Sequence, residues 1–397
     1  MRPLGIYIHI PFCKTKCDYC DFYSKPCVKA DVNEYVKALT AHLDEANLKN
    51  TDYEVDTIYF GGGTPTIIGE KNLIKIANAI YKNFKVLKDC ETTLEANPNT
   101  VTYPMLKKLI KVGFNRISFG VQSSNPFELK ELGRTHTFDQ AQQAVELARK
   151  AGFKNISLDL MYGLPGQSEK TWQRSLEDIA ALEPDHISCY ALKLEEGTPM
   201  CRNAAAYDLP DDDKMADFYL MAVEYLEKAG YRQYEISNFA KPGMESKHNL
   251  KYWTMGDYWG FGPSAHSMMG KKRFSYVRDT CGYIDGVLNH DTVVDKSEEC
   301  NSTSERAGEY LMLALRTVDG ICAETVEKKY LTYFDEIEKC LLKYHKYGHV
   351  EFDGEKWRLT PKGFLISNTI ISEVLIALEN SRSIVNKNMY KRPEERM

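Results

Sequence analysis

The sequence predicts an α/β fold: a partial (β/α)6 barrel of TIM type, followed by a mainly helical, winged-helix-like C-terminal domain. Three observations lead to this prediction. In the first half of the chain, short β-rich runs alternate with amphipathic stretches, which is the pattern of a parallel sheet with helical crossovers. Six such units fall short of the eight that close a barrel. Near the C-terminus, helices are followed by a hairpin with an Asp-Gly turn at Asp353 and Gly354.

The composition of the 397-residue chain excludes several classes of protein. A net charge of −5 creates no basic field that would hold nucleic acid or an anionic membrane. No apolar run approaches the roughly 18 residues of a membrane span. The 11 cysteines are an odd number, and we find no secretory signal before them. A long cytosolic chain keeps its thiols reduced, so we expect a cytoplasmic protein without a disulfide scaffold.

The elements of the six units follow from hydrophobic periodicity and from helix end signals. A helix is expected from Asp31, which has capping-box spacing to Glu34, and later helices should stop at Gly113 and Gly152. The predicted strands are residues 5–10, 56–60, 92–96, 116–121, 155–161 and 186–192. The predicted helices are residues 31–43, 73–80, 105–112, 138–151, 168–182 and 211–229.

Four segments are expected along the chain. Residues 1–235 form the barrel domain, and residues 236–300 form an aromatic and glycine-rich connecting region. Residues 301–378 form the winged-helix-like domain, and residues 379–397 form a polar tail that we expect to be flexible. The wing has only sparse basic residues, balanced by acidic ones, so we expect it to pack on a domain or a partner rather than to read DNA.

The residues with unusual chemistry all fall where a predicted strand ends. The cysteine cluster follows the first strand, and a run of three glycines that includes Gly62 and Gly63 follows the second. Glu95 closes the third strand, Gln122 closes the fourth, and Asp159 lies late in the fifth. Because the strands of such a barrel end at one rim, we expect these residues to share one site.

Cys13, Cys17 and Cys20 form a C-x3-C-x2-C motif on the loop after the first strand. Four thiolates usually hold a cubane iron–sulfur cluster, so three leave one iron open to an exchangeable ligand. Zinc is the competing interpretation, but zinc spacing normally comes in two halves and this sequence has no second half. A chance triplet is a weaker alternative. The remaining cysteines form no tight cluster, and even the nearby Cys27 is expected to be structural.

Residues 7–22, which read YIHIPFCKTKCDYCDF, resemble the radical S-adenosylmethionine (SAM) superfamily. Within it, the chain is similar, from Gly5 to about Ile376, to the family of oxygen-independent coproporphyrinogen III oxidase and its heme-chaperone relatives. The resemblance implies a [4Fe–4S] cluster on the three cysteines, with SAM chelating the fourth iron through its amino and carboxylate groups. It also implies the partial barrel.

Further positions match the family pattern one by one. The glycine-rich loop that approaches the methionine end of SAM matches Gly62, Gly63 and Thr64, since only glycine lets backbone pass so close to a ligand. Glu95 matches a carboxylate that the family places beside SAM. The positions that line the adenosine or second-ligand region match Gln122, Arg134, Asp159 and Ala191.

These matches also have plainer structural explanations. Three glycines alone are more often a turn, Glu95 could be a strand-end residue, and Arg134 a surface charge on a helix. Asp159 is harder to explain in this way, because a carboxylate between two leucines needs a partner. Tyr7, just before the cluster, either packs on it or is a strand aromatic.

Two departures separate the chain from the oxidase pattern. The oxidase has a further cysteine two residues after the third cluster cysteine, where this chain has Phe22. The oxidase also has a long N-terminal extension that contributes to substrate handling, whereas four residues precede Gly5 here. Both departures put decarboxylation of coproporphyrinogen III in doubt and favour a heme chaperone over an enzyme.

An His-Asn-x-x-Tyr-Trp motif begins at His248 and resembles one in the heme chaperones. An imidazole is a standard axial ligand of heme iron, and aromatics offer a flat wall for a porphyrin. His248 is the predicted heme ligand, and His266 is the substitute. The competing interpretation is that a lone histidine among aromatics is a satisfied structural residue.

The sequence thus predicts a heme chaperone that carries a [4Fe–4S] cluster and SAM and passes heme to an acceptor protein. The alternative is an oxygen-independent coproporphyrinogen III oxidase, and a third, weaker one is a nucleic-acid-binding iron–sulfur regulator, which the acidic balance disfavours. No membrane span is expected, although a partner could bring the protein to a membrane. A homodimer is left open.

Overall fold

The structure is a computed structural model that describes residues 1–299 and 302–389, the side chains of residue 304 and of residues 382–389 excepted. Residues 390–397, the end of the predicted flexible tail, lie outside the described residues. The chain divides into two compact units. The first contains residues 1–232, 237–251 and 256–299, and the second contains residues 233–236 and 252–255 with most of the chain after residue 299.

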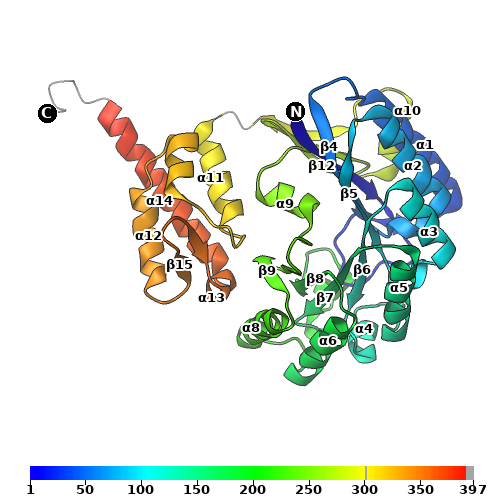
Figure 1. Cartoon of the computed structure of the whole chain (residues 1–397), viewed down its shortest axis with the longest axis horizontal. Helices are drawn as coiled ribbons and strands as arrows, with labels where there is room; N and C mark the ends of the chain where they lie inside the picture. Colours follow the sequence, from blue (N-terminus) through cyan, green and yellow to red (C-terminus); the bar gives the residue numbers. More distant parts are fainter. Residues whose placement is uncertain (300–301, 390–397) are drawn as a thin grey trace. The chain divides into compact units, whose positions relative to one another are not determined.

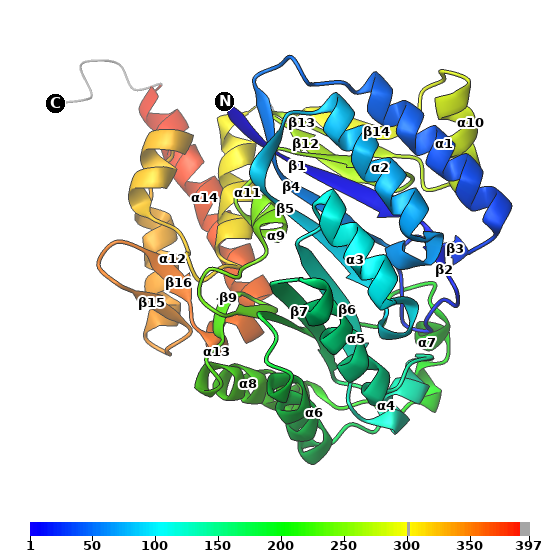
Figure 2. The same cartoon turned by 45° about the vertical axis from the view of Figure 1, so that its right-hand side comes forward.

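Six neighbouring parallel strands form the centre of the first unit, in the order in which they occur in the sequence (Figures 1 and 2). They are β1 (Arg2–Ile10), β4 (Tyr53–Gly62), β5 (Val86–Ala96), β6 (Arg116–Gln122), β7 (Asn155–Tyr162) and β8 (His186–Ala191). The first five contain the strands predicted from the hydrophobic pattern, and β8 ends one residue before the predicted end at residue 192. Their carboxyl ends share one rim, as expected for right-handed crossovers. The predicted α/β fold with a partial barrel is confirmed.

Helices cover the outer face of these strands (Figure 2). They are α1 (Lys29–Glu45), α2 (Glu70–Asn83), α3 (Tyr103–Val112), α5 (Phe138–Ala151), α6 (Glu169–Ala181) and α8 (Asp212–Lys228). Two helices end where predicted, at Gly113 with φ 109° and Gly152 with φ 115°, because glycine adopts this left-handed conformation without strain. Thr137 begins α5 with a complete capping box.

The capping-box prediction at Asp31 is wrong. Helix α1 starts two residues earlier, at Lys29, after Val28, whose side chain makes no cap hydrogen bond. Asp31 therefore lies in the first turn, where its carboxylate pairs with the Lys25 ammonium at 2.6 Å. An acidic side chain is favourable there because it faces the positive end of the helix dipole. Spacing alone could not separate a cap from a first-turn residue.

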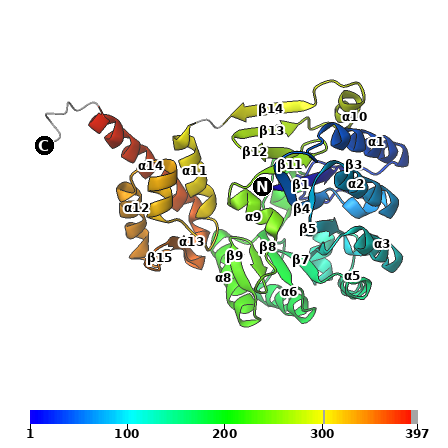
Figure 3. The ribbon, with the colours of Figure 1, turned by 45° about the horizontal axis from the view of Figure 1, so that its top comes forward.

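Residues 238–299 extend the same sheet at both ends (Figure 3). Strand β10 (Asn238–Ala240) pairs antiparallel with β8, and β11 (Tyr258–Phe261) pairs parallel with β1. Strands β12 (His266–Met269), β13 (Lys272–Tyr276) and β14 (Val294–Glu299) follow β11 in antiparallel order. Helices α9 (Lys247–Trp253) and α10 (Thr280–Leu288) lie between them in sequence. The barrel strands are thus flanked on both sides and do not close into a ring.

The alternation along β4 separates the two faces of the sheet. Ile58 and Phe60 are buried, and the Phe60 ring packs against Phe114 at 5.0 Å between centroids, in the hydrophobic layer under the helices. Thr57 and Tyr59 point to the opposite, inner face. Helix α9 lies on that inner face, across the sheet from α2 and α3 (Figure 1).

Among its described residues, the second unit contains four further α-helices, a short π-helix (Thr325–Lys329) and a hairpin. The helices are α11 (Thr303–Ala314), α12 (Asp335–His345), α13 (Pro361–Leu365) and α14 (Ser367–Met389). The hairpin pairs β15 (Val350–Phe352) with β16 (Trp357–Leu359), across the predicted Asp-Gly turn. Among the described residues, no helix is both long enough and apolar enough to cross a membrane.

Candidate functional site

The three cysteines of the motif lie on one loop that leaves the carboxyl end of β1. Cys13 ends the short strand β2 (Phe12–Cys13), which pairs with β3 (Lys25–Pro26) and so holds the two ends of the loop together. The Cys20 amide donates to the Cys17 carbonyl at 3.2 Å, which folds the loop back on itself. Burial raises the pKa of the Cys20 thiol, and the nearby Cys17 and Cys13 thiolates act in the same direction.

The glycine run is joined to the cysteine loop by backbone hydrogen bonds. The Thr64 amide donates to the Phe12 carbonyl at 2.7 Å, and the Thr64 hydroxyl lies 3.6 Å from the Cys13 sulfur. A Cβ on Gly63 would lie 2.5 Å from the Phe12 carbonyl oxygen, which is closer than real Cβ atoms approach. Gly62 has φ 107°, where a side chain would be strained. The close approach of the two loops is therefore enough to require glycine at positions 62 and 63, independently of any bound ligand.

Glu95 is half-buried on the inner face at the end of β5. It accepts a hydrogen bond from the Tyr59 hydroxyl at 2.7 Å and another from the Gly62 amide at 3.2 Å. Burial raises the pKa of its carboxyl to about 7; Asp159 adds to the rise, while the two hydrogen bonds and Arg116 oppose it. The site thus holds a carboxylate that changes charge near neutral pH, and its position is set by the same loop that meets the cysteines.

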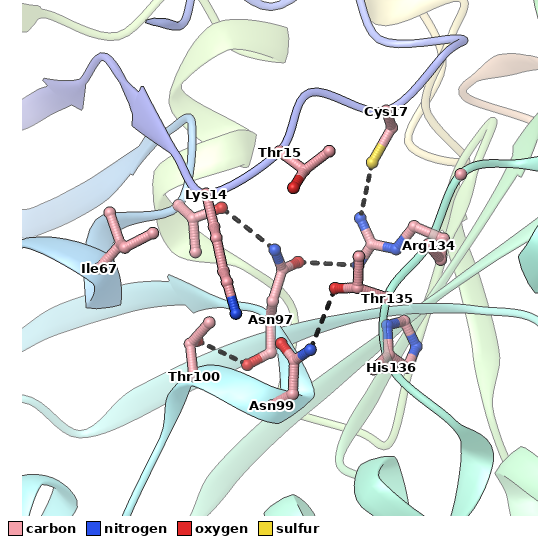
Figure 4. Close-up of a pocket in the computed structure, with 12 residues that line it drawn as sticks. Lys14, Thr15, Cys17, Ile67, Asn97, Asn99, Thr100, Arg134, Thr135 and His136 are labelled. Carbon is pink, nitrogen blue, oxygen red and sulfur yellow. Dashed lines mark hydrogen bonds between the residues drawn. The ribbon is translucent and has the colours of Figure 1, made fainter. Parts of the chain in front are cut away.

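Arg134 connects the cysteine loop to the ends of β5 and β6 (Figure 4). Its guanidinium donates to the Cys17 sulfur at 3.5 Å, to the Asn97 side-chain oxygen at 2.7 Å and to the Gly120 carbonyl at 2.5 Å. Asn97 in turn donates to the Thr64 hydroxyl at 3.1 Å. The alternative of a surface helix charge is therefore wrong for Arg134. Sequence reasoning missed Asn97, although its place just after the third predicted strand was the available indication.

An open pocket lies beside Cys17 (Figure 4). Its walls combine polar side chains with one positive guanidinium. The residues that line it are Lys14, Thr15, Cys17, Thr64, Ile67, Asn97, Asn99, Thr100, Gly133, Arg134, Thr135 and His136. Within the described ranges, no three His, Cys, Asp or Glu side chains are grouped around a position for a single metal ion. Three separate soft thiol donors on one loop, with an open polar pocket beside them, fit a cluster and a polar organic ligand.

The other predicted residues of the rim lie around the same strand ends. Gln122 ends β6 with φ 71°, and its side-chain nitrogen and the Arg134 guanidinium both crowd the space over Gly120. Asp159 accepts from the Ser118 hydroxyl at 3.1 Å, and burial raises the pKa of its carboxyl. Ala191 is exposed at the end of β8.

Tyr7 and His248 lie deeper, on the inner face of the sheet. The Tyr7 hydroxyl hydrogen-bonds to His9 Nδ1 at 3.0 Å, and its ring contacts that of His248. His248 is fully buried on α9: its Nδ1 lies 2.9 Å from the Thr57 hydroxyl, and its ring stacks on Tyr59. Burial lowers the pKa of its imidazole to about 3. Its assignment as heme ligand stays a prediction, and ligation would require the ring to leave this enclosure. The substitute, His266, is exposed on β12.

A parallel partial barrel, whose first loop carries three cysteines beside a glycine loop and a half-buried carboxylate, defines a protein of the radical SAM type. Residues 7–179 match the Radical SAM superfamily, and residues 302–366 match the HemN C-terminal domain. The chain is 36% identical to the heme chaperone HemW of Bacillus subtilis (strain 168), over 93% of this chain and 98% of that relative. The chain belongs to the HemW family, which confirms the resemblance seen in residues 7–22.

A second relative and a solved structure agree with this. The heme chaperone HemW of Escherichia coli (strain K12) is 34% identical, over 94% of this chain and 98% of its own length. The structure of coproporphyrinogen III oxidase (HemN) from Escherichia coli, described as a radical SAM enzyme, has a TM-score of 0.82 and 23% identity, and the match covers 95% of this chain and 90% of that one. At this identity the likeness establishes the fold alone.

Proposed function

We propose that the protein is a heme chaperone that binds heme and passes it to an acceptor protein. The observation that carries the proposal is the similarity to proteins named heme chaperone HemW along almost the whole chain, at 36% and 34% identity. The similarity spans both the barrel with its cysteine loop and the C-terminal unit, so the whole architecture is shared. The acceptor is proposed to be another protein, met in the cytoplasm or at a membrane through a partner.

The proposed cofactors are a [4Fe–4S] cluster on Cys13, Cys17 and Cys20, and SAM in the adjacent pocket. Bound this way, the cluster supplies an iron without a protein ligand, where SAM is the exchangeable ligand. Arg134 donates a hydrogen bond to the Cys17 sulfur and so fixes the position of one proposed cluster ligand. Glu95 contributes a carboxylate of adjustable charge beside the glycine loop, suited to the cationic end of SAM. Gly62 and Gly63 let the backbone turn close to that ligand.

Phe22 supports a chaperone rather than an oxidase at this site. It stands where the oxidase pattern has a further cysteine, and its side chain is 70% exposed beside the cluster loop. The loop around it is held on both sides: the Arg278 guanidinium donates to the Asp21 carbonyl at 2.8 Å, and the Thr280 amide donates to the Tyr23 hydroxyl at 2.7 Å. An apolar ring therefore faces solvent from an anchored loop, where a cysteine would supply reactive sulfur.

The test is an anaerobic comparison of two activities of the reconstituted protein. Heme uptake is followed by the absorption spectrum during titration, and transfer by adding an apo-form of a heme protein. In parallel, the protein is incubated with SAM, a reductant and coproporphyrinogen III. The proposal predicts saturable uptake and transfer of heme without protoporphyrinogen. Formation of protoporphyrinogen would instead establish the oxidase. If the His248→Ala variant takes up heme as the wild type does, His248 is not the heme ligand, but the proposed chaperone function stands.

A further inference from the structure

Helix α9 is anchored on the inner face of the sheet by residues in the first half or the middle of β1, β4 and β5. The Glu91 carboxylate on β5 accepts the backbone amides of Lys247 at 3.2 Å and His248 at 3.1 Å, which satisfies the free amides at the start of the helix. The Lys251 ammonium lies 2.7 Å from the carboxylate of Asp56 on β4. Gly5 on β1 leaves the room that the helix needs, since a Cβ there would lie 2.8 Å from the Lys251 side chain and 3.2 Å from His248.

From this helix a column of side chains leads to the carboxylate of the SAM site. The His248 ring stacks on Tyr59, with 5.2 Å between centroids and 29° between planes. The Tyr59 hydroxyl donates to Glu95 at 2.7 Å, and the second Glu95 oxygen accepts from the Gly62 amide. His248 is fully buried, so the stack has no freedom to tilt without opening a cavity.

A second column leads from the same histidine to the cysteine loop. The Tyr7 ring lies 6.4 Å from His248 and 6.2 Å from Tyr59. The Tyr7 hydroxyl meets His9 Nδ1 at 3.0 Å, and His9 Nε2 meets the Tyr23 carbonyl at 2.9 Å, at the end of the cysteine loop. Because a carbonyl only accepts, Nε2 carries the proton, and Nδ1 of this neutral imidazole accepts from Tyr7. Burial keeps His9 neutral by lowering its pKa to about 4.

We propose that His248 is a positioning residue of the SAM site, which holds Tyr59 against Glu95 and supports the cysteine loop through Tyr7 and His9. This inference rests on the proposed binding of SAM and assigns to the His-Asn-x-x-Tyr-Trp motif a role that does not require contact with heme. In this proposal His248 lies on the inner face of the sheet and does not touch SAM, which binds at the carboxyl ends of the strands. Loss of its ring would loosen Tyr59 and weaken the bond to Glu95.

The effect of His248 and Tyr59 on Glu95 can be measured, because it changes the pH at which the Glu95 carboxyl ionises. The groups that face its carboxyl are Tyr59 on β4, Arg116 on β6, Asp159 on β7 and the Gly62 amide; the Tyr59 hydrogen bond favours the ionised form. SAM carries positive charge on its sulfonium and amino groups, so its affinity should rise as Glu95 ionises, around pH 7. Without the Tyr59 bond, the carboxyl ionises at higher pH, and the midpoint of the affinity profile moves upward.

The experiment measures SAM binding by equilibrium dialysis against the anaerobically reconstituted full-length protein, between pH 6 and pH 9. Tyr59→Phe removes only the hydroxyl, and we expect SAM to bind about fivefold more weakly at pH 7, with a midpoint about one pH unit higher. His248→Ala should shift the midpoint in the same direction. His248→Phe, which restores a flat ring against Tyr59, should recover most of the lost affinity.

Two matched controls separate this effect from general destabilisation. Tyr231→Phe removes a buried hydroxyl that donates to the Pro184 carbonyl, and His42→Ala removes a buried imidazole bonded to Tyr283. Neither should move the SAM profile. Heme uptake is measured on every variant.

Three outcomes overturn the inference. One is a profile of Tyr59→Phe that matches the wild-type profile. Another is a His248→Phe variant that behaves like His248→Ala in SAM binding. The third is a loss of heme uptake in both His248 variants while SAM binding stays unchanged, which would make His248 a ligand and not a positioning residue. If the wild-type protein binds heme but no SAM, the proposed SAM site itself is wrong. This result is visible in the wild-type measurement, before any variant is compared.

Discussion

Gly63→Ala tests how closely the glycine loop and the cysteine loop depend on each other. The added Cβ would lie 2.5 Å from the Phe12 carbonyl oxygen and 2.9 Å from the Ile10 carbonyl oxygen. Both neighbours are backbone atoms, one at the end of β1 and one in β2, so neither can rotate away as a flexible side chain would. The two loops must therefore move apart.

The cost of that movement can be worked from the bonds it stretches. The Gly63 amide donates to Ile10 at 2.8 Å, and the Thr64 amide donates to Phe12 at 2.7 Å. Overpacking of this kind typically costs about 1–3 kcal/mol, and each weakened hydrogen bond adds about 1 kcal/mol. We therefore expect the unfolding free energy of the barrel unit to fall by about 3–5 kcal/mol. The position of the Cys13 sulfur beside Thr64 should be lost as well.

The assay is urea unfolding with linear extrapolation, together with iron content after reconstitution. Gly308→Ala is the matched control: this glycine lies inside α11, and a Cβ there would meet its nearest atoms at an ordinary 3.5 Å. Alanine should stabilise that helix slightly, by up to about 1 kcal/mol. A Gly63→Ala protein that unfolds within about 0.5 kcal/mol of the wild type, with full iron content, would refute the reasoning.

Three further predictions concern other parts of the first unit. Cys17→Ser should lose iron after reconstitution, whereas Cys27→Ser should retain it; equal iron in both variants would contradict the assignment of ligands. Thr137→Ala removes the capping box of α5 and should cost about 1 kcal/mol in urea unfolding, and an unchanged midpoint would count against this cap. Burial lowers the pKa of His42 to about 4, so the folded protein resists its protonation. The unfolded chain gains that proton first as the pH falls below about 6.5. The unfolding free energy should then decline toward pH 4, by up to about 1.4 kcal/mol per pH unit from this residue. In His42→Gln the decline should be shallower, and an identical slope would exclude this contribution.

The sequence alone was sufficient for the alternation of strands and helices in the barrel. Buried strands are continuous apolar runs and surface helices have a 3.6-residue period, so both signals are local. The stop signals at Gly113 and Gly152 are local too, because left-handed glycine ends a helix whatever surrounds it. The spacing of Cys13, Cys17 and Cys20 indicated a cluster loop for the same reason.

Short elements and their pairing could not be predicted in this way. Strands β10 to β14 have three to six residues each, too few for a periodic signal, and they become strands by hydrogen bonding to β8, to β1 and to one another. Asp31 shows a related limit, since its spacing to Glu34 fits a capping box although α1 begins before it.

The site shows the same division between local and tertiary information. The sequence alone predicted that Glu95, Gln122 and Asp159 lie at one rim, because each is at the end of a predicted strand and parallel strands end on the same side. Only the tertiary structure brought Asn97 between Thr64 and Arg134, and only it enclosed His248 beneath Tyr59. The sequence by itself determined which residues have reactive or ionisable groups and which strand end carries them. Burial and hydrogen-bond partners come from chain segments far apart in sequence, so the tertiary structure alone decided the charge of Glu95 and the surroundings of His248.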